Sequence, residues 1–183
     1  TLTEAAFAFE DISGYSPEES LRVANSLMNQ FGVTAEEAYN LMVQGQQQGL
    51  DFSGELLDSI NEYAPQFEKM GFSAEDMFNI FKSGAESGAF NLDKIGDAVK
   101  ENAIRVIDLS ESTTNAFTAL GLDASQMASE FGAGGETAEK AFQKVMVGLQ
   151  SIEDPVKRNQ IGTALWGTMW EDLGETVILS SAD

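Results

Sequence analysis

Three pairs of adjacent acidic residues are of a type and spacing that could support acid-base catalysis or bind a metal ion. They are Glu36-Glu37, Glu75-Asp76 and Glu171-Asp172. Paired carboxylates act as a general acid and base, or hold a metal ion, when a cleft brings both to one substrate. Neighbours on a helix point to different faces, however, and acids in a first helical turn interact favourably with the helix dipole. We therefore interpret the pairs as capping and solvated residues and expect no catalytic site.

The chain contains no histidine and no cysteine, which excludes several kinds of active site. Catalysis by Ser-His-Asp or Cys-His groups is excluded, as are structural zinc sites, iron-sulfur clusters and haem with a His or Cys ligand. The chemistry of Asp, Glu, Tyr, Lys, Ser and Thr remains. We predict a protein that is not an enzyme and that has no cofactor and no metal site.

Two segments have a superficial similarity to ligand-binding loops. Gly132 to Gly135 is rich in glycine like a phosphate loop, but a helical pattern precedes it and Glu136 would repel phosphate at the following helix N-terminus. Asn91 to Gly96 places a glycine where a calcium loop has one, but Ile95 and Asn102 stand where oxygen-rich ligands are needed. We predict a helix-helix turn at the first segment and no calcium site at the second.

The segment from Trp166 to Gly174 carries both tryptophans of the chain, four residues apart on one face of an expected helix. Such a pair most often belongs to a core, but tryptophan is also a frequent anchor in protein interfaces. Acidic residues follow the second tryptophan directly. The candidate contact with a partner protein is made of Trp166, Trp170, Glu171 and Asp172.

Acidic residues outnumber basic ones by 30 to 10, which gives a formal net charge of −20 at pH 7. A charge of this sign repels phosphate backbones and anionic lipid surfaces. No stretch approaches the ~18 consecutive apolar residues of a membrane span. We predict neither nucleic-acid binding nor membrane contact. The chain begins without an initiator methionine, and we expect it to be an internal fragment of a longer protein.

Short amphipathic helices that begin at capping residues are the dominant sequence pattern. Apolar residues recur at three- and four-residue spacing after each cap. The predicted caps are Ser16, Thr34, Ser73, Asp123 and Asp154. Alternation typical of strands is absent, and only Val177-Ile178-Leu179 could form one. The patterns predict an all-α chain with about nine or ten helices.

Residues 31–64 recur as residues 70–103 at an offset of 39 positions. Nine aligned positions are identical, among them Asn40/Asn79 and Gly45/Gly84, where chance would give about two. Each unit reads as a capped helix, a glycine-containing break and a second helix. Residues 121–183 are predicted to hold a degenerate third copy and C-terminal helices. We predict one all-α module over residues 1–183, either a bundle or a short solenoid of helical hairpins.

Four segments of the chain resemble the tape measure proteins of phage tails, and they occur in the order that this family shows. The segments are Gly49–Asp58, Asn61–Phe67, Phe90–Glu101 and Trp166–Gly174. The resemblance implies a structural module of a phage or prophage tail protein. Such proteins occupy the lumen of the growing tail tube, set the tail length and leave when DNA is ejected.

The same resemblance implies partners and a location, but no catalytic residue. The implied partners are other tail proteins, namely the tail tube, the tail assembly chaperone and the tail tip. The implied location is the lumen of the virion tail, and the host bacterial cytoplasm during assembly. An alternative is a scaffold of HEAT-like helical repeats that binds a protein partner, because two helices in a period of about 40 residues are typical of such solenoids.

The charge generates a prediction about DNA. The purified chain should show no binding to duplex DNA at low salt, where electrostatic attraction would be strongest. An electrophoretic mobility assay at micromolar protein measures this, with a basic DNA-binding protein as the positive control. Salt-sensitive DNA binding by the chain would contradict the prediction.

Overall fold

The computed structural model describes residues 1–182, which form twelve α-helices and no strand. The first six helices are α1 (Leu2–Ser13), α2 (Pro17–Phe31), α3 (Ala35–Gln47), α4 (Leu56–Lys69), α5 (Ala74–Glu86) and α6 (Leu92–Arg105). The others are α7 (Glu111–Ala119), α8 (Ala124–Ala133), α9 (Gly135–Gln150), α10 (Pro155–Trp166), α11 (Met169–Leu173) and α12 (Glu175–Ser180). The predicted all-α fold is confirmed, although the expected number of helices was too low.

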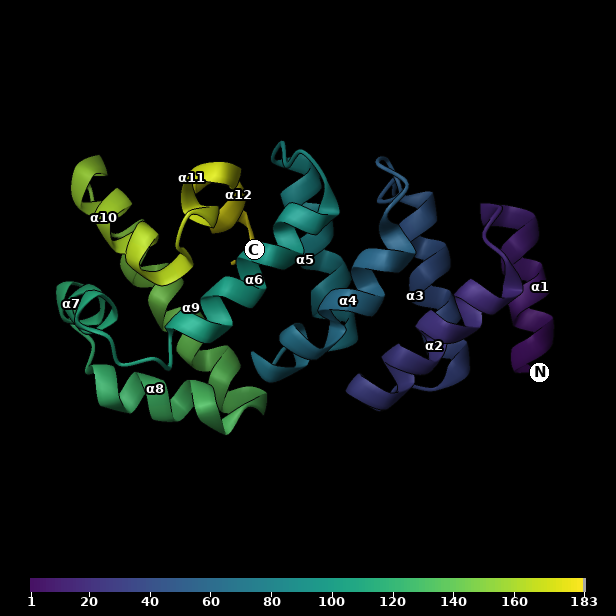
Figure 1. Cartoon of the computed structure of the whole chain (residues 1–183), viewed down its shortest axis with the longest axis horizontal. Coiled ribbons are helices and arrows are strands. Elements are labelled where there is room, and N and C mark those ends of the chain that lie inside the picture. The colour runs from purple at the N-terminus through teal and green to yellow at the C-terminus, as the bar shows by residue number, and fades with distance from the viewer. Residues whose placement is uncertain (183) are drawn as a thin grey trace.

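The first six helices form hairpins that stack side by side in two rows (Figure 1). One row contains α1, α3 and α5, and the other contains α2, α4 and α6. Helix α4 packs against α2 on one side and against α6 on the other, and it also contacts α5. This arrangement is a short solenoid of helical hairpins, one of the two arrangements that the sequence predicted.

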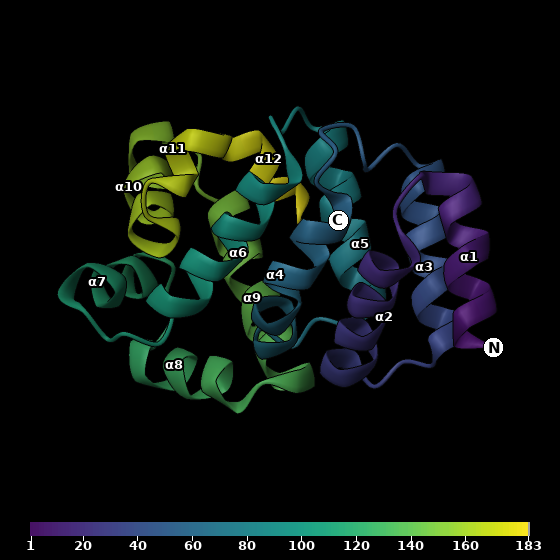
Figure 2. The same ribbon diagram turned by 45° about the vertical axis from the view of Figure 1, so that its right-hand side comes forward.

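The C-terminal helices do not extend the two rows in chain order (Figure 2). Helices α8 and α9 pack on each other, and α9 also contacts α4 and α10. The chain then returns, because α10 and α11 pack on α6 while α12 packs on α5. The end of the solenoid is therefore covered by α10, α11 and α12. Within residues 1–182, no helix combines the length and apolar character that a membrane crossing requires.

The segment Val177-Ile178-Leu179 lies in helix α12, so the expectation that it could be a strand was wrong. A strand needs a neighbour that pairs its backbone N–H and C=O groups, whereas a helix pairs them within the segment. No other strand occurs in the described residues. Val177 and Ile178 are buried and place the apolar face of α12 against the protein interior.

The predicted helix caps are present at all five positions. Ser16, Thr34 and Ser73 form complete capping boxes, in which the acid three residues later accepts a hydrogen bond from the backbone N–H of the cap. Sequence reasoning missed the boxed cap at Thr1 and the cap at Asn91. Asn91 accepts a hydrogen bond from the Lys94 backbone N–H at 2.9 Å, so the segment with a calcium-loop-like glycine is the start of α6.

The first helices of the two repeat units agree with the sequence offset. Helices α3 and α5 begin at Ala35 and Ala74 and end at Gln47 and Glu86, so both ends differ by 39 positions. The second helices do not follow this offset, because α6 begins at Leu92, 36 positions after the start of α4. The Asn91 cap explains the difference, since it starts α6 one turn early. Full superposition of residues 31–64 on 70–103 stays a prediction.

Glycines inside the helices allow the two helices of each repeated hairpin to approach closely. A Cβ atom on Gly45 would lie 3.4 Å from the Leu56 side chain, and one on Gly84 would lie 2.6 Å from the Ile95 side chain. Leu56 and Ile95 are themselves related by the 39-residue offset. Gly84 therefore leaves space that the Ile95 side chain fills, whereas a Cβ atom on Gly45 would make an ordinary contact with Leu56.

Helices α4 and α6 meet at a buried tyrosine. The Tyr63 hydroxyl donates a hydrogen bond to the Asp93 carboxylate at 2.7 Å and lies 2.9 Å from an oxygen of Asp97. Burial, together with these carboxylates, raises the pKa of Tyr63 above its usual range, so the phenol keeps its proton. The ring lies over Gly96, where a Cβ atom would come within 2.1 Å of a ring carbon.

This contact predicts opposite effects for two glycine-to-alanine substitutions. Gly96→Ala should destabilise the fold by about 1–3 kcal/mol, because the new methyl group overlaps a buried ring. Gly132→Ala is the matched control, since that glycine lies inside α8 with no atom within 4 Å of its added Cβ. It should stabilise the fold by about 0.5–1 kcal/mol through helix propensity. Urea unfolding measures both, and wild-type stability of Gly96→Ala would contradict the packing.

Candidate partner-binding site around Trp166 and Trp170

The two tryptophans lie on different helices, because the chain turns between them. Helix α10 ends at Trp166, and Gly167 adopts a positive φ of 62° before α11 begins at Met169. A side chain at Gly167 would clash with Arg105 of α6, since its Cβ atom would lie 2.9 Å from the guanidinium. The expected single helix face was therefore wrong. The turn instead brings the two indole rings to a centroid distance of 5.7 Å.

Both tryptophans are buried in the protein's own core, and each has 2% of its surface exposed. They cannot serve as exposed anchors for a partner in this structure. The expectation that the two tryptophans contact a partner was therefore wrong. Glu171 and Asp172 lie on the surface. The Asp172 carboxylate pairs with the Lys94 ammonium of α6 at 3.5 Å. Only the acidic half of the predicted site therefore remains open to a partner.

The position of Trp170 depends on two residues of α10. Its indole Nε1–H donates a hydrogen bond to the Asn159 side-chain oxygen at 2.9 Å. Gly162 lies against the ring face, where a Cβ atom would come within 2.2 Å of the ring carbons. The glycine inside α10 therefore makes room for the indole, and the asparagine satisfies its polar edge.

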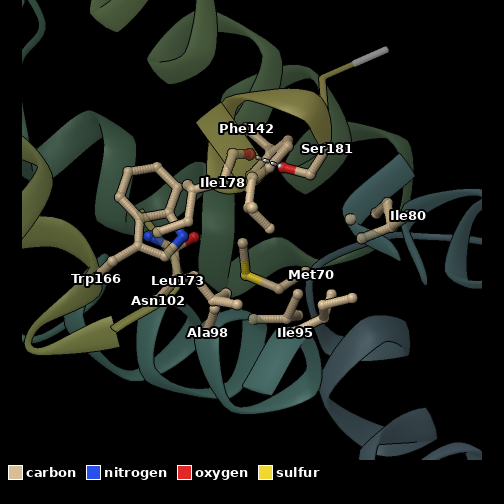
Figure 3. A pocket seen from close by; sticks show the side chains of 13 residues that line it. Met70, Ile80, Ile95, Ala98, Asn102, Phe142, Trp166, Leu173, Ile178 and Ser181 are labelled. Atoms are coloured by element: carbon tan, nitrogen blue, oxygen red, sulfur yellow. Dashed lines mark hydrogen bonds between the residues drawn. The ribbon is translucent and has the colours of Figure 1, made fainter. Parts of the chain in front are cut away.

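A small cavity lies behind Trp166, between the end of the solenoid and the returning helices (Figure 3). It has a volume of about 20 Å³ and is lined mainly by apolar side chains from α5, α6, α9 and α12. Asn102 borders it, donating from Nδ2 to the Leu165 carbonyl at 2.8 Å, while its buried Oδ1 has no hydrogen-bond partner in the described residues. A space of this size has room for about one water molecule, so it does not accommodate an organic ligand.

The outer side of the same segment forms an open cleft of about 600 Å³ between α6, α7, α10 and α11. Its lining is rich in hydroxyl and amide groups, including those of Asn159, Gln160, Thr163 and Thr168. The Arg105 guanidinium at its edge is neutralised by Glu101 at 2.7 Å. Sequence reasoning missed this cleft, because its residues come from four helices and carry no common motif. The arrangement can form hydrogen bonds to a partner but offers no nucleophile with an activating base.

The adjacent acids predicted from the sequence do not meet as catalytic pairs. Glu37 and Asp76 each cap their own helix, whereas Glu36 and Glu75 occupy the first turns without a hydrogen bond. The Thr34 backbone N–H and hydroxyl hold the pKa of Glu37 below its usual range. No group of three or more acidic side chains suited to a metal ion occurs in residues 1–182.

Residues 1–167 match the family model of phage-related minor tail proteins. The chain belongs to this family. It is 30% identical over 188 residues to the probable tape measure protein of Streptomyces phage phiC31, and the match covers 94% of this chain and 26% of the phage protein. No solved structure matches the chain.

Membership in this family assigns the chain a structural role in the phage tail. The resemblance to tape measure proteins that the sequence showed is thereby confirmed. The family match does not favour a HEAT-like scaffold, although the minor tail protein shares the stacked-hairpin geometry of such proteins.

The indole hydrogen bond predicts the effect of changing Asn159 in the minor tail protein. Asn159→Val should destabilise the fold by about 1 kcal/mol, because the buried indole N–H loses its acceptor while helix propensity hardly changes. Asn159→Asp is the matched control, since it keeps an acceptor oxygen. Urea unfolding followed by tryptophan fluorescence compares the two. Equal stability of the valine and aspartate variants would show that this hydrogen bond does not hold Trp170.

Proposed function

We propose that this minor tail protein is a helical module of a tape measure protein that sets tail length inside the tail tube. The observation that carries the proposal is the match to phage-related minor tail proteins over residues 1–167, joined to 30% identity with a probable tape measure protein. The chain spans 26% of that relative's length. Length measurement is therefore a property of the longer protein, to which this module contributes its own length.

The proposed location is the lumen of the virion tail, reached from the cytoplasm of the host bacterium during assembly. The tail tube, the tail assembly chaperone and the tail tip are the proposed partners. The net charge of −20 supports this location, because an acidic module repels DNA and clears the channel when DNA passes. The same charge supports the proposal that the module does not bind nucleic acid.

The proposed role is mechanical and needs no catalysis. The chain has no histidine and no cysteine, and its paired acids serve helix caps or lie apart on the surface. A rigid stack suits a module that contributes length, since each hairpin is held by its neighbours along the rows. The close glycine contacts between successive helices support this rigidity.

Tail length in the parent phage or prophage tests this proposal. In-frame deletion of residues 1–182 should shorten the tails, and in-frame duplication should lengthen them, because the number of residues in the ruler changes. Gly96→Ala is the control, since it weakens the fold without changing the number of residues. Electron microscopy of purified particles measures the tails.

Each strain has an outcome that decides the proposal. Tails of the duplication strain that keep the parental length contradict a measuring role. Shortened tails in the Gly96→Ala strain also contradict it, because folding and not length would then be the cause. If the deletion strain forms no tails, the duplication strain decides.

A further inference from the structure

The sequence repeat builds two grooves with corresponding linings beside helices α3 and α5. The first groove has a volume of about 360 Å³ and lies between α3 and the start of α5. The second has a volume of about 200 Å³ and lies between α5 and α9, next to the end of α12. Five lining positions of the first groove recur in the second at the 39-residue offset. Figure 2 shows α3 and α5 side by side in one row.

Each groove has an apolar floor. Val33 and Leu41 line the first groove, and their counterparts Phe72 and Ile80 line the second. Val33 and Leu41 are half-buried, while Phe72 and Ile80 are buried with 6% exposure each. The first groove therefore offers more apolar surface at its base than the second.

Each groove also has carboxylates on both walls. Glu37 of α3 and Glu75 of α5 line the first groove, and Asp76 of α5 and Glu139 of α9 line the second. Glu37 and Asp76 each use one carboxylate oxygen for a helix cap, and the other oxygen makes no hydrogen bond in the described residues. None of the four has an ion-pair partner in residues 1–182, and neither lining contains a basic side chain.

An asparagine also lines each groove. Asn40 and Asn79 are identical in the two units, exposed, and located inside α3 and α5. Neither side chain makes a hydrogen bond within the described residues. Asparagine is unfavourable in the interior of a helix, so helix stability does not account for its presence at both positions.

We propose that the two grooves bind two basic side chains of one partner polypeptide. The aliphatic stem of a lysine or arginine lies on the apolar floor, while its cationic group meets the carboxylates of both walls. The asparagine oxygen accepts a further hydrogen bond from the same group. The surplus of 20 acidic residues in the chain gives the charge complementarity for a basic partner. This inference goes beyond the proposed function and does not depend on it.

The helix spacing defines the partner more closely. Neighbouring packed helices lie about 8–10 Å apart, so the two grooves are separated by about one helix spacing. On a partner helix, residues i and i+7 lie on the same face and about 10 Å apart. A helical segment with arginine or lysine at this spacing fits both grooves together.

An alanine-rich helical peptide with arginines at positions i and i+7 is the probe. Titration into the isotope-labelled chain should shift the side-chain amide signals of Asn40 and Asn79 in NMR spectra. The same peptide with both arginines replaced by glutamine should shift neither. Removing the groove charges with E37Q, E75Q, D76N and E139Q together should weaken binding about tenfold, as expected for several partly exposed ion contacts. Gln and Asn keep an acceptor for the caps, so the variant folds.

The control variant is E10Q/D11N, on the exposed face of α1. It is compared with E37Q/E75Q, because both variants remove two negative charges. Loss of affinity in the groove variant, with no more than a small change in the control, supports the proposal. An equal loss of affinity in both variants overturns it, because any acidic residue of the chain would then bind the peptide. Absence of shifts at Asn40 and Asn79 also overturns it. Equal binding of a peptide with arginines at i and i+3 overturns the paired use of the grooves.

Discussion

The burial of α4 between α2 and α6 is the contact on which the rest of the structure depends. A single helical hairpin cannot cover its own apolar face, so each hairpin relies on its neighbours. Leu56, Ile60 and Phe67 of α4 are fully buried or nearly so. Tyr63 links the same helix to the Asp93 and Asp97 carboxylates of α6. The row of α2, α4 and α6 therefore holds the hairpins in register. The row of α1, α3 and α5 packs on it.

The packing of the hairpins also determines which surfaces a partner can reach. Burial removes both tryptophans from the surface and leaves a polar cleft beside α10 and α11. The stacking of α3, α5 and α9 brings acids from different helices to shared grooves. The proposed role in the tail depends on such surfaces and on the length of the module. The same helix contacts thus support both the proposed measuring role and the proposed partner binding.

Local features of this fold could be predicted from the sequence, because they depend on residues close together in the chain. Ser16, Thr34 and Ser73 identified helix starts, and the turn at Gly134 was correctly placed between two helices. The turn at Gly167 was missed, although its positive φ and the nearby Arg105 side chain both favour glycine at this position. The return of α10, α11 and α12 to the end of the solenoid was also not predictable, because apolar periodicity does not say which helices meet.

The candidate site was harder to predict than the fold. The motif Glu36-Glu37 suggested a pair of adjacent acids, whereas the structure places Glu37 and Glu75 of the next unit in the lining of one groove. The repeat offset contained this information, since the lining positions recur at 39 residues, but only the order of packed helices shows that they form grooves.

The central claim is that the module is enclosed within the tail of the virion. Protease treatment of intact particles, followed by mass spectrometry of peptides from residues 1–182, tests it most directly. The account predicts that these peptides remain protected before DNA ejection and leave the particle after ejection is triggered. An outer tail protein treated in the same sample shows that the protease is active. Digestion of the module in intact particles, or its absence from them, would contradict the account.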